Sequence, residues 1–397
     1  MKWGDYTEII REFKGIIESA DSLVKSSKNN AKSMVFFTPN VPVEVITASG
    51  VTPVRICSAI AQRASKTSTD SILQPFTCPW IQLQLNLLLN ESFSLDGVIF
   101  SENYCDSLLN FYNAYKKNTN LSIKFNTYGF LHPAKREYTT EIGYYLHELK
   151  QFTAWLEEWT GKDVNVNNLL ESIRLHNEKR RLLRELSWQV AQDNNQMLFS
   201  EFFTVVLGCD IVPVEKAIDL LQKTVNIVKI TGSNGDNTVN SHSINNVLIS
   251  GNTFDNPRLL RKIPALDSYV KADDLSFGSR SFNFDVKVTS PQNDFDQLLM
   301  DIAHRYVVEK IPNGFHDDVT HRKEYISDQI KKYNISGVIF INYTYCDHGG
   351  LTSRRLTSFL ENQGTKVLNL ETDPQLSNLR KLTTRIEPFL EALTAGR

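Results

Sequence analysis

One pattern occurs twice in this chain and limits what it can fold into: an apolar run, a polar loop, a Cys-Asp pair and a helical stretch. The first copy, GVIFSENYCDS, covers residues 97–107, and the second, GVIFINYTYCDH, covers residues 337–348. A buried strand that leads through a short loop into a helix is the repeating unit of parallel α/β sheets. We therefore expect two similar α/β units, each with one copy of the pattern.

Further apolar runs agree with two such units. Strands of the first unit are predicted at 34–40, 52–57, 96–100 and, from a weaker pattern, 122–126, with helices at 43–49 and 80–90. Strands of the second unit are predicted at 246–252, 268–275, 335–340 and 366–373, with helices at 296–311 and 353–364. Gly50 is expected to end the first of these helices.

The segment between the two units has a helical period instead. Apolar residues recur every three or four positions from about residue 137 until Gly161, and helices are also predicted at 165–190, behind Asn caps, and at 215–225. The basic run Lys179, Arg180 and Arg181 is interpreted as a solvated helix face. The polar stretch 231–245 contains a Gly-x-x-Gly but lacks a strand-to-helix glycine-rich turn, so we interpret it as a linker or surface excursion.

The predicted fold class is α/β, with two Rossmann-like parallel-sheet domains and an intervening helical region. The predicted divisions are an N-terminal helix at 1–28, a first α/β domain at 29–136, a helical region at 137–228 and a second α/β domain at 229–397. A chain of 397 residues is too long for a single core, which agrees with several domains.

The cysteines suggest a metal centre. The chain has five: Cys57, Cys78, Cys105, Cys209 and Cys346. An odd, scattered set is a poor disulfide framework. Cys78 stands before Pro79, which suits the first turn of a helix, while Cys105 and Cys346 follow predicted strands. Ligands collect at the carboxyl edge of parallel sheets, where a helix N-terminus lowers the pKa of a thiol. These three thiols are expected to meet where the two units face each other.

Two interpretations of the cysteines stay open at this point. A cysteine after a buried strand often only fills apolar space, which is the interpretation we favour for Cys57, while Cys209 is interpreted as a thiol in a loop or at a helix end. Otherwise Cys78, Cys105 and Cys346 bind a metal, with zinc and a 4Fe-4S cluster as the alternatives. Three ligands would leave one metal position open to water or substrate. Of the eight histidines, only His348 lies beside a candidate ligand.

Composition limits the class of partner. A net charge of -2 and an isoelectric point near 6.5 give no reason to expect a nucleic acid or an anionic membrane. No run of about 18 apolar residues occurs, and Glu8, Arg11 and Glu12 interrupt the apolar residues of the amphipathic N-terminal helix. We expect a cytoplasmic protein.

Six stretches, in order, resemble the family of 2-hydroxyacyl-CoA dehydratase and benzoyl-CoA reductase subunits. They are TPNVPVEVITASGVTPVRI (38–56), QPFTCPW (74–80), LDGVIFSENYCDSL (95–108), VKADDLSFGSRSF (270–282), GVIFINYTYCD (337–347) and LTTRIEPFLEAL (382–393). The resemblance implies a dimer with a homologous second subunit or with a second copy of itself. It also implies a 4Fe-4S cluster held by the cysteines that match Cys78, Cys105 and Cys346.

The resemblance further implies a reaction class. An acyl-CoA thioester approaches the cluster, and a separate ATP-dependent iron–sulfur activator supplies one electron at low potential. The resulting ketyl radical permits either dehydration or reduction of an aromatic ring. Asp106 and Asp347 are expected to cap helices or orient the adjacent cysteine. Arg280 is expected to pair with a CoA phosphate or a carboxylate near the cluster, or to form a structural salt bridge. His348 is expected to donate a hydrogen bond or a proton near Cys346.

The chain also departs from the family pattern. Trp80, Ile81 and Gln82 follow the first cysteine where the family often has an arginine, and residues 265–274 lack the usual Gly-Ala. Because of these departures, the sequence does not determine which acyl-CoA is the substrate. The alternatives are a noncatalytic electron-relay or partner subunit, a double-cubane-type reductase if Cys57 and Cys209 are also ligands, and a zinc-binding or structural protein.

Overall fold

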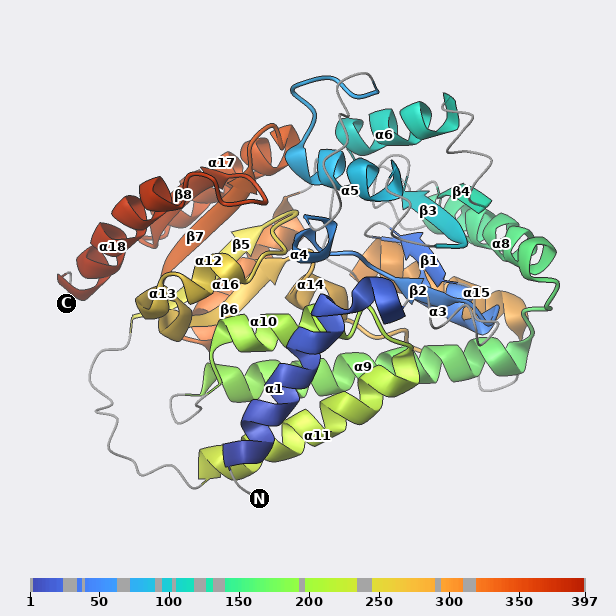
Figure 1. Ribbon diagram of the computed structural model, residues 1–397, viewed down its shortest axis with the longest axis horizontal. Coiled ribbons are helices and arrows are strands. Elements are labelled where there is room, and N and C mark those ends of the chain that lie inside the picture. Colours follow the sequence, from blue (N-terminus) through green and yellow to red (C-terminus); the bar gives the residue numbers. More distant parts are fainter. Residues whose placement is uncertain are drawn as a thin grey trace.

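Two parallel sheets lie side by side in this chain, with helices packed around and beneath them (Figure 1). The structure is a computed structural model that describes residues 3–23, 34–37, 40–62, 72–89, 95–101, 105–117, 126–130, 140–192, 197–233, 245–289, 294–309 and 319–395. The predicted α/β class with parallel sheets is confirmed for these residues. The Rossmann-like type of each unit stays a prediction.

The two sheets have the same topology. The first contains β1 (Met34–Phe37), β2 (Thr52–Val54), β3 (Gly97–Ser101) and β4 (Asn126–Phe130), in the order β2-β1-β3-β4. The second contains β5 (Asn246–Gly251), β6 (Val270–Leu275), β7 (Ile335–Tyr343) and β8 (Lys366–Thr372), in the order β6-β5-β7-β8. The repeated sequence pattern therefore occupies equivalent strands, β3 and β7, each paired in parallel with the first strand of its sheet.

Helices of the first unit follow the expected order. They are α3 (Val43–Ala48), α4 (Ser58–Ala61), α5 (Pro79–Leu89) and α6 (Asp106–Lys117). After α3 the chain turns at Gly50, where φ is 80° and a glycine meets no steric penalty. Residues 122–125 of the weakest predicted strand lie outside the described residues, and β4 begins at Asn126.

The middle of the chain is helical, as predicted. Its elements are α8 (Thr140–Thr160), α9 (Val166–Ala191), α10 (Phe199–Gly208) and α11 (Val214–Ser233). The Asn165 side chain accepts hydrogen bonds from the amides of Asn167 and Asn168 and so caps α9. Helix α10 was not predicted, because nearly all of its side chains are buried and a helix that is buried all round has no apolar stripe. The N-terminal helix α1 (Trp3–Glu18) packs on α10 and α11.

The remaining helices belong by sequence to the second unit. They are α12 (Arg258–Arg261), α13 (Pro264–Tyr269), α14 (Ser279–Phe282), α15 (Phe295–His304), the π-helical turn η1 (Arg305–Glu309), α16 (Thr320–Lys332), α17 (Asp347–Asn362) and α18 (Leu379–Ala395). Helix α15 nevertheless packs against α8, beside the first sheet (Figure 1). Its Leu299 and Ile302 share an apolar cluster with Leu149 and Phe152 of α8.

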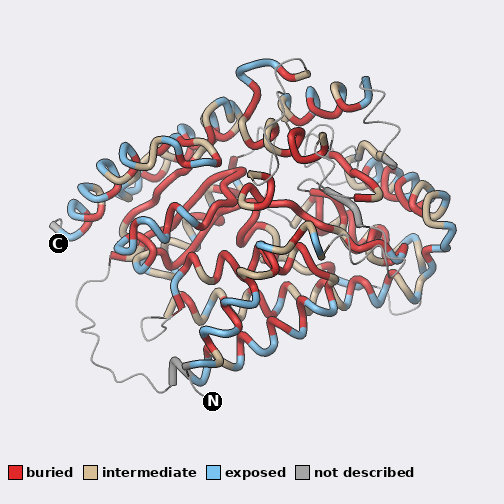
Figure 2. Tube along the Cα trace, viewed as in Figure 1, coloured by how far each residue is buried: buried red, intermediate tan, exposed pale blue. Residues whose placement is uncertain are grey.

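The predicted domain boundaries stay predictions, but the positions of helices α9 and α11 bear on them. The expected boundary after residue 228 falls inside α11, which continues to Ser233. Helix α9 contacts α3 of the first unit and both β6 and α14 of the second, so it joins the two units. Among the described residues, β5, β6, β7 and the inward faces of the helices are largely buried, whereas the outer helical faces and most of the edge strand β8 are exposed or partly exposed (Figure 2). No described helix is long and apolar enough to span a membrane.

Candidate functional site

Three cysteines from distant parts of the sequence line one pocket. Cys78 and Cys105 come from the first unit and Cys346 from the second. We call this site the cysteine pocket, and its other lining residues are Trp80, Ile81, Asp106, Ser107, Leu108, Asn252, Thr253, Tyr345, Asp347 and His348. The expected meeting of these thiols between the two units is therefore observed.

Each of the three cysteines immediately precedes a helix. Cys78 leads into α5 at Pro79, Cys105 leads into α6, and Cys346 is the N-cap residue of α17. Cys105 and Cys346 follow β3 and β7, the equivalent strands of the two sheets. The repeated sequence pattern thus brings one thiol from each unit to the same place, and the loop before α5 adds the third.

The thiols interact electrostatically with one another. Cys78 donates a hydrogen bond to the Cys346 sulfur, and this bond raises the pKa of Cys78 well above its usual value and lowers the pKa of Cys346. The amide of Gly349 also donates to Cys346 and favours its thiolate. Burial raises the pKa of Cys105 to about 12. The Cys346 sulfur is therefore the member of the set that most readily becomes a thiolate.

Two buried polar groups also line the cysteine pocket. Asn252 and Thr253 follow β5 and are 3% and 9% exposed. Asn252 Nδ2 has no hydrogen-bond partner among the described residues, and Thr253 Oγ1 has none except the Cys346 sulfur beside it. Buried polar groups are normally paired, so the Asn252 amide is available to a bound group, while the Thr253 hydroxyl already contacts the Cys346 sulfur. Sequence reasoning missed them, although their place at the carboxyl end of a parallel strand was a usable signal.

The acidic residues and the histidine expected near the thiols also line the pocket. Asp106 and Asp347 are exposed and occupy the first positions of α6 and α17. The prediction that Asp347 caps its helix is wrong, because Cys346 occupies the N-cap position; the Asp347 carboxylate instead lies in the first turn, near the positive end of the helix dipole. His348 is partly buried beside Cys346.

Arg280 lies outside the lining of the cysteine pocket. Its side chain is fully buried, and its Nε lies 3.2 Å from Asp274 Oδ1. Its guanidinium also donates to Asn252 Oδ1 and to the carbonyl oxygens of Gly251 and Asp274. Arg280 therefore orients Asn252 without itself lining the cysteine pocket, as part of a buried ion-pair network.

The two other cysteines lie apart from the cysteine pocket. Cys57 precedes α4 and Cys209 follows α10, and each is 1% exposed within the main apolar core. Burial raises the pKa of both thiols to about 12. The surroundings of Cys57 agree with its predicted role as apolar filler, and Cys209 is the C-cap residue of α10, which agrees with its interpretation as a helix-end thiol.

The donor set of the cysteine pocket fits an iron–sulfur cluster. Within the described ranges, no three His, Cys, Asp or Glu side chains are close enough together to hold one metal ion. A cluster binds each cysteine through a different iron, so its thiols need not converge on a single atom. The polar side chains of Asn252 and Thr253 suit the inorganic sulfurs or a fourth ligand. Cys78, Cys105 and Cys346 would hold the cluster.

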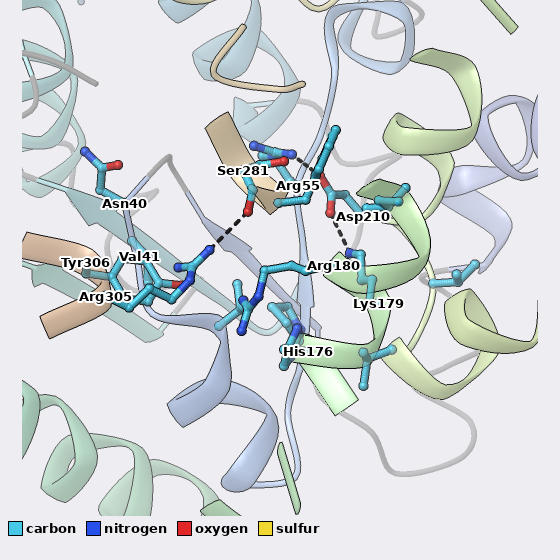
Figure 3. Close-up of a pocket in the computed structure, with 16 residues that line it drawn as sticks. Asn40, Val41, Arg55, His176, Lys179, Arg180, Asp210, Ser281, Arg305 and Tyr306 are labelled. Atoms are coloured by element: carbon cyan, nitrogen blue, oxygen red, sulfur yellow. Dashed lines mark hydrogen bonds and ion pairs between the residues drawn. The ribbon is translucent and has the colours of Figure 1, made fainter. Parts of the chain in front are cut away.

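The basic run of α9 differs from its interpretation as a solvated face. Arg181 is exposed, as expected, but Arg180 is 4% exposed and Lys179 is largely buried in an ion pair with Asp210. Both line a second cavity together with His176 of the same helix (Figure 3). The interpretation failed because the first unit and η1 cover this side of α9, and no periodic pattern in α9 itself indicates that contact.

Comparison with known proteins adds independent information. Residues 38–393 match the family model described as 2-hydroxyglutaryl-CoA dehydratase, D-component. The chain is 22% identical to the β subunit of (R)-2-hydroxyglutaryl-CoA dehydratase of Acidaminococcus fermentans. It is also 22% identical to the β subunit of (R)-phenyllactyl-CoA dehydratase of Clostridium sporogenes. Both matches cover 97% of this chain and 99% of the relative. It is also 22% identical to a subunit of benzoyl-CoA reductase of Thauera aromatica, over 86% of both chains.

Proposed function

Since the chain belongs to the family of 2-hydroxyglutaryl-CoA dehydratase D-components, we propose that it is the iron–sulfur subunit of a radical acyl-CoA enzyme. The proposed cofactor is a 4Fe-4S cluster held by Cys78, Cys105 and Cys346. The proposed reaction begins with one-electron reduction of an acyl-CoA thioester, in an enzyme of the dehydratase or benzoyl-CoA reductase type.

One observation carries this proposal. Three thiols from both α/β units line the same pocket, next to the buried amide of Asn252, whose Nδ2 has no partner among the described residues. A structural zinc or a complete cluster normally has four protein ligands. Three cysteines leave one position for a substrate atom or another small ligand, which is what reaction at a metal requires.

A bound cluster would supply one-electron transfer, and the remaining steps depend on residues of this chain. Asn252 and Thr253 present hydrogen-bond donors beside the thiols and would orient a polar group of the substrate. His348, at the same pocket, is the candidate proton donor. Asp106 and Asp347 lie at the rim and would orient the adjacent cysteine or a cofactor group, whereas Arg280 acts through Asn252.

The proposed partners follow from the relatives. Two of these relatives are named as β subunits of dehydratases, so a homologous second subunit is the expected partner, with self-association as the alternative. A separate ATP-dependent iron–sulfur activator would deliver the electron. The β-subunit names also favour a second candidate function, in which this chain is the relay or partner subunit and the other subunit binds the acyl-CoA.

Measurement of iron and acid-labile sulfide after anaerobic purification tests the cluster. We expect about four of each per wild-type chain and a large loss in Cys78→Ser, Cys105→Ser and Cys346→Ser. Cys57→Ser and Cys209→Ser are matched controls that remove a buried thiol elsewhere and should keep their iron. Iron-free wild-type protein after reconstitution, or equal loss in the controls, would overturn the assignment.

Binding measurements separate the two candidate functions. A catalytic subunit should bind an acyl-CoA, and the visible spectrum of its cluster should change on binding. A relay subunit should hold the cluster but bind no acyl-CoA without its partner. For the assembled enzyme, ATP consumed per product distinguishes dehydration, which recycles the electron, from ring reduction, which consumes two electrons per turnover.

A further inference from the structure

A second cavity is lined by His176, Lys179 and Arg180 of α9 and shares no lining residue with the cysteine pocket. We call it the cationic cavity, because its walls carry Arg55, Lys179, Arg180 and Arg305 (Figure 3). Its volume is about 80 Å³. On this measure a cavity holds one water at roughly 10–15 Å³, so the cationic cavity admits a group of several atoms.

The charges around the cationic cavity do not balance. Its four cations face Asp210, which pairs with both Arg55 and Lys179, and Glu44, which pairs with Arg180 at 2.8 Å. Asp285 lies outside the lining, forms a bidentate pair with Arg184 and also lies 3.5 Å from Arg180 Nε, so Asp285 and Arg184 together add no net charge. His176 adds no charge at neutral pH, because burial lowers its pKa to about 3. The cavity therefore has an excess of about two positive charges.

Arg305 contributes most to this excess. It is 2% exposed, and its Nε and Nη2 donate to the carbonyl oxygens of Phe284 and Ser281. Its Nη1 has no hydrogen-bond partner among the described residues, and no carboxylate of those residues pairs with it. The two Glu44 oxygens are already bonded to Arg180 and to Tyr306 Oη. Arg305 lowers the pKa of Glu44 through space but makes no ion-pair contact with a carboxylate among the described residues, so it is the cation of the cavity that most needs an anion.

Arg55 presents a second open donor. It is 6% exposed, its Nη2 pairs with Asp210, and its guanidinium stacks on Phe277 with Cζ 4.3 Å from the ring centre. Its Nε has no hydrogen-bond partner among the described residues. Figure 3 shows the Arg305 side chain on one side of the cavity, the Arg55–Asp210–Lys179 group on the other and Arg180 between them.

We propose that the cationic cavity is a binding site for a phosphate group, either inorganic phosphate or the phosphate of a larger molecule. A tetrahedral dianion accepts hydrogen bonds on several sides and matches both the surrounding cations and the excess of charge. A carboxylate carries one charge and accepts mainly along one edge. The phosphate is therefore the better fit of the two common oxyanions. This site is independent of the proposed cluster.

Calorimetric titration of the full chain with inorganic phosphate tests the site. We expect saturable binding with a dissociation constant at or below about 1 mM. Acetate at the same ionic strength should bind at least about tenfold more weakly, because it has half the charge. Coenzyme A and its form without the 3′-phosphate, titrated in competition with phosphate, distinguish a free phosphate from one carried by a larger molecule.

Variants locate the binding. Arg305→Gln should weaken phosphate binding by about tenfold to a hundredfold, because it removes a charged donor at the open position. Arg181→Gln is the matched control, because it removes the same charge from the exposed face of α9. It should change phosphate binding less than about twofold, since solvent and salt screen an exposed charge. Arg305→Lys keeps the charge without the planar donor pair and should bind between these two.

Each outcome decides for or against the phosphate site. Saturable phosphate binding that Arg305→Gln weakens and Arg181→Gln does not would support it. Wild-type protein that binds no phosphate up to roughly 10 mM, or that binds acetate equally well, would overturn it. Equal weakening in Arg305→Gln and Arg181→Gln would also overturn it. Where Arg305→Gln fails to fold, Arg305→Lys and the wild-type titrations still decide.

Discussion

The indole of Trp80 donates a hydrogen bond to the carboxylate of Asp255 across the two α/β units, from Nε1 to Oδ2 at 3.0 Å. Asp255 is fully buried and also accepts from the amide and hydroxyl of Ser58 and from Tyr343 Oη. Trp80 lies two residues after Cys78, and Tyr343 three residues before Cys346. Asp255 therefore ties together the segments that carry two of the pocket's thiols.

Trp80→Phe should destabilise the protein by about 1.5–3 kcal/mol, the usual contribution of a hydrogen bond to a charged group. The phenyl ring keeps most of the buried area and removes only the donor. Urea unfolding followed by circular dichroism measures the change. Trp188→Phe is the matched control, because Trp188 is 46% exposed, and it should cost at most about 0.5 kcal/mol. Equal costs for both variants would contradict the assigned role of Trp80.

Glu44→Gln should cost about 3–5 kcal/mol of unfolding free energy, because it leaves the buried Arg180 without its closest carboxylate. Burial alone would raise the pKa of Glu44, but Arg180 and then Arg305 hold it at about 2. Glu171→Gln breaks an exposed pair with Arg174 and should cost less than about 1 kcal/mol. The same urea titration compares them, and similar small losses in both variants would count against this account.

Asp273→Asn should change how stability depends on pH between about 4 and 6. Burial raises the pKa of Asp273 to about 6, from an ordinary value of 3.8, so the folded protein binds this proton more tightly than the unfolded chain. The stabilisation is complete below about pH 4 and is lost as the pH rises through 6. Since each pKa unit corresponds to about 1.4 kcal/mol, the loss amounts to roughly 3 kcal/mol.

The asparagine variant cannot lose that proton, so its stability relative to wild type should rise by this amount from pH 4 to pH 7. Comparing the two proteins cancels the opposite effect of His176, which is present in both. Asp296→Asn, at an exposed carboxylate, is the control and should follow the wild-type profile. Parallel curves for Asp273→Asn and wild type would contradict the prediction.

Most strands and helices were predictable because their patterns are local. The repeated pattern placed β3 and β7 and the helices after Cys105 and Cys346, and Asn165 and Gly161 marked helix ends. The meeting of the three thiols followed from the parallel arrangement of both sheets. Contacts between distant segments were not predictable in this way. Helix α15 packs beside the first sheet, and Arg180 lines a cavity, because each contacts a segment that is distant in the sequence. The local sequence around each of them does not indicate that contact.

Gly349→Ala should disturb the cysteine pocket, whereas Gly350→Ala, one residue later in α17, should not. A Cβ at Gly349 would lie 2.7 Å from Asn342 Oδ1 and 3.0 Å from the Cys346 sulfur, while a Cβ at Gly350 meets nothing within 4 Å. Alanine at 349 must displace the Asn342 amide, which is hydrogen-bonded to Ser353, and press on the Cys346 sulfur, or else bend the first turn of the helix, at a cost of about 1–3 kcal/mol. Alanine at 350 should be neutral or stabilise the helix by up to about 1 kcal/mol.

The two alanine variants differ by the position of one methyl group, so their comparison isolates the packing around Cys346. Thermal unfolding measures the stability difference, and the rate of Cys346 alkylation reports whether the sulfur has moved. If the proposed cluster is bound there, the iron content after anaerobic purification should fall by more than about half in Gly349→Ala and stay at the wild-type level in Gly350→Ala. Equal alkylation rates and equal stability in both variants would show that the pocket tolerates a side chain at position 349. The close contact between Gly349 and the sulfur would then have no part in holding Cys346 in place.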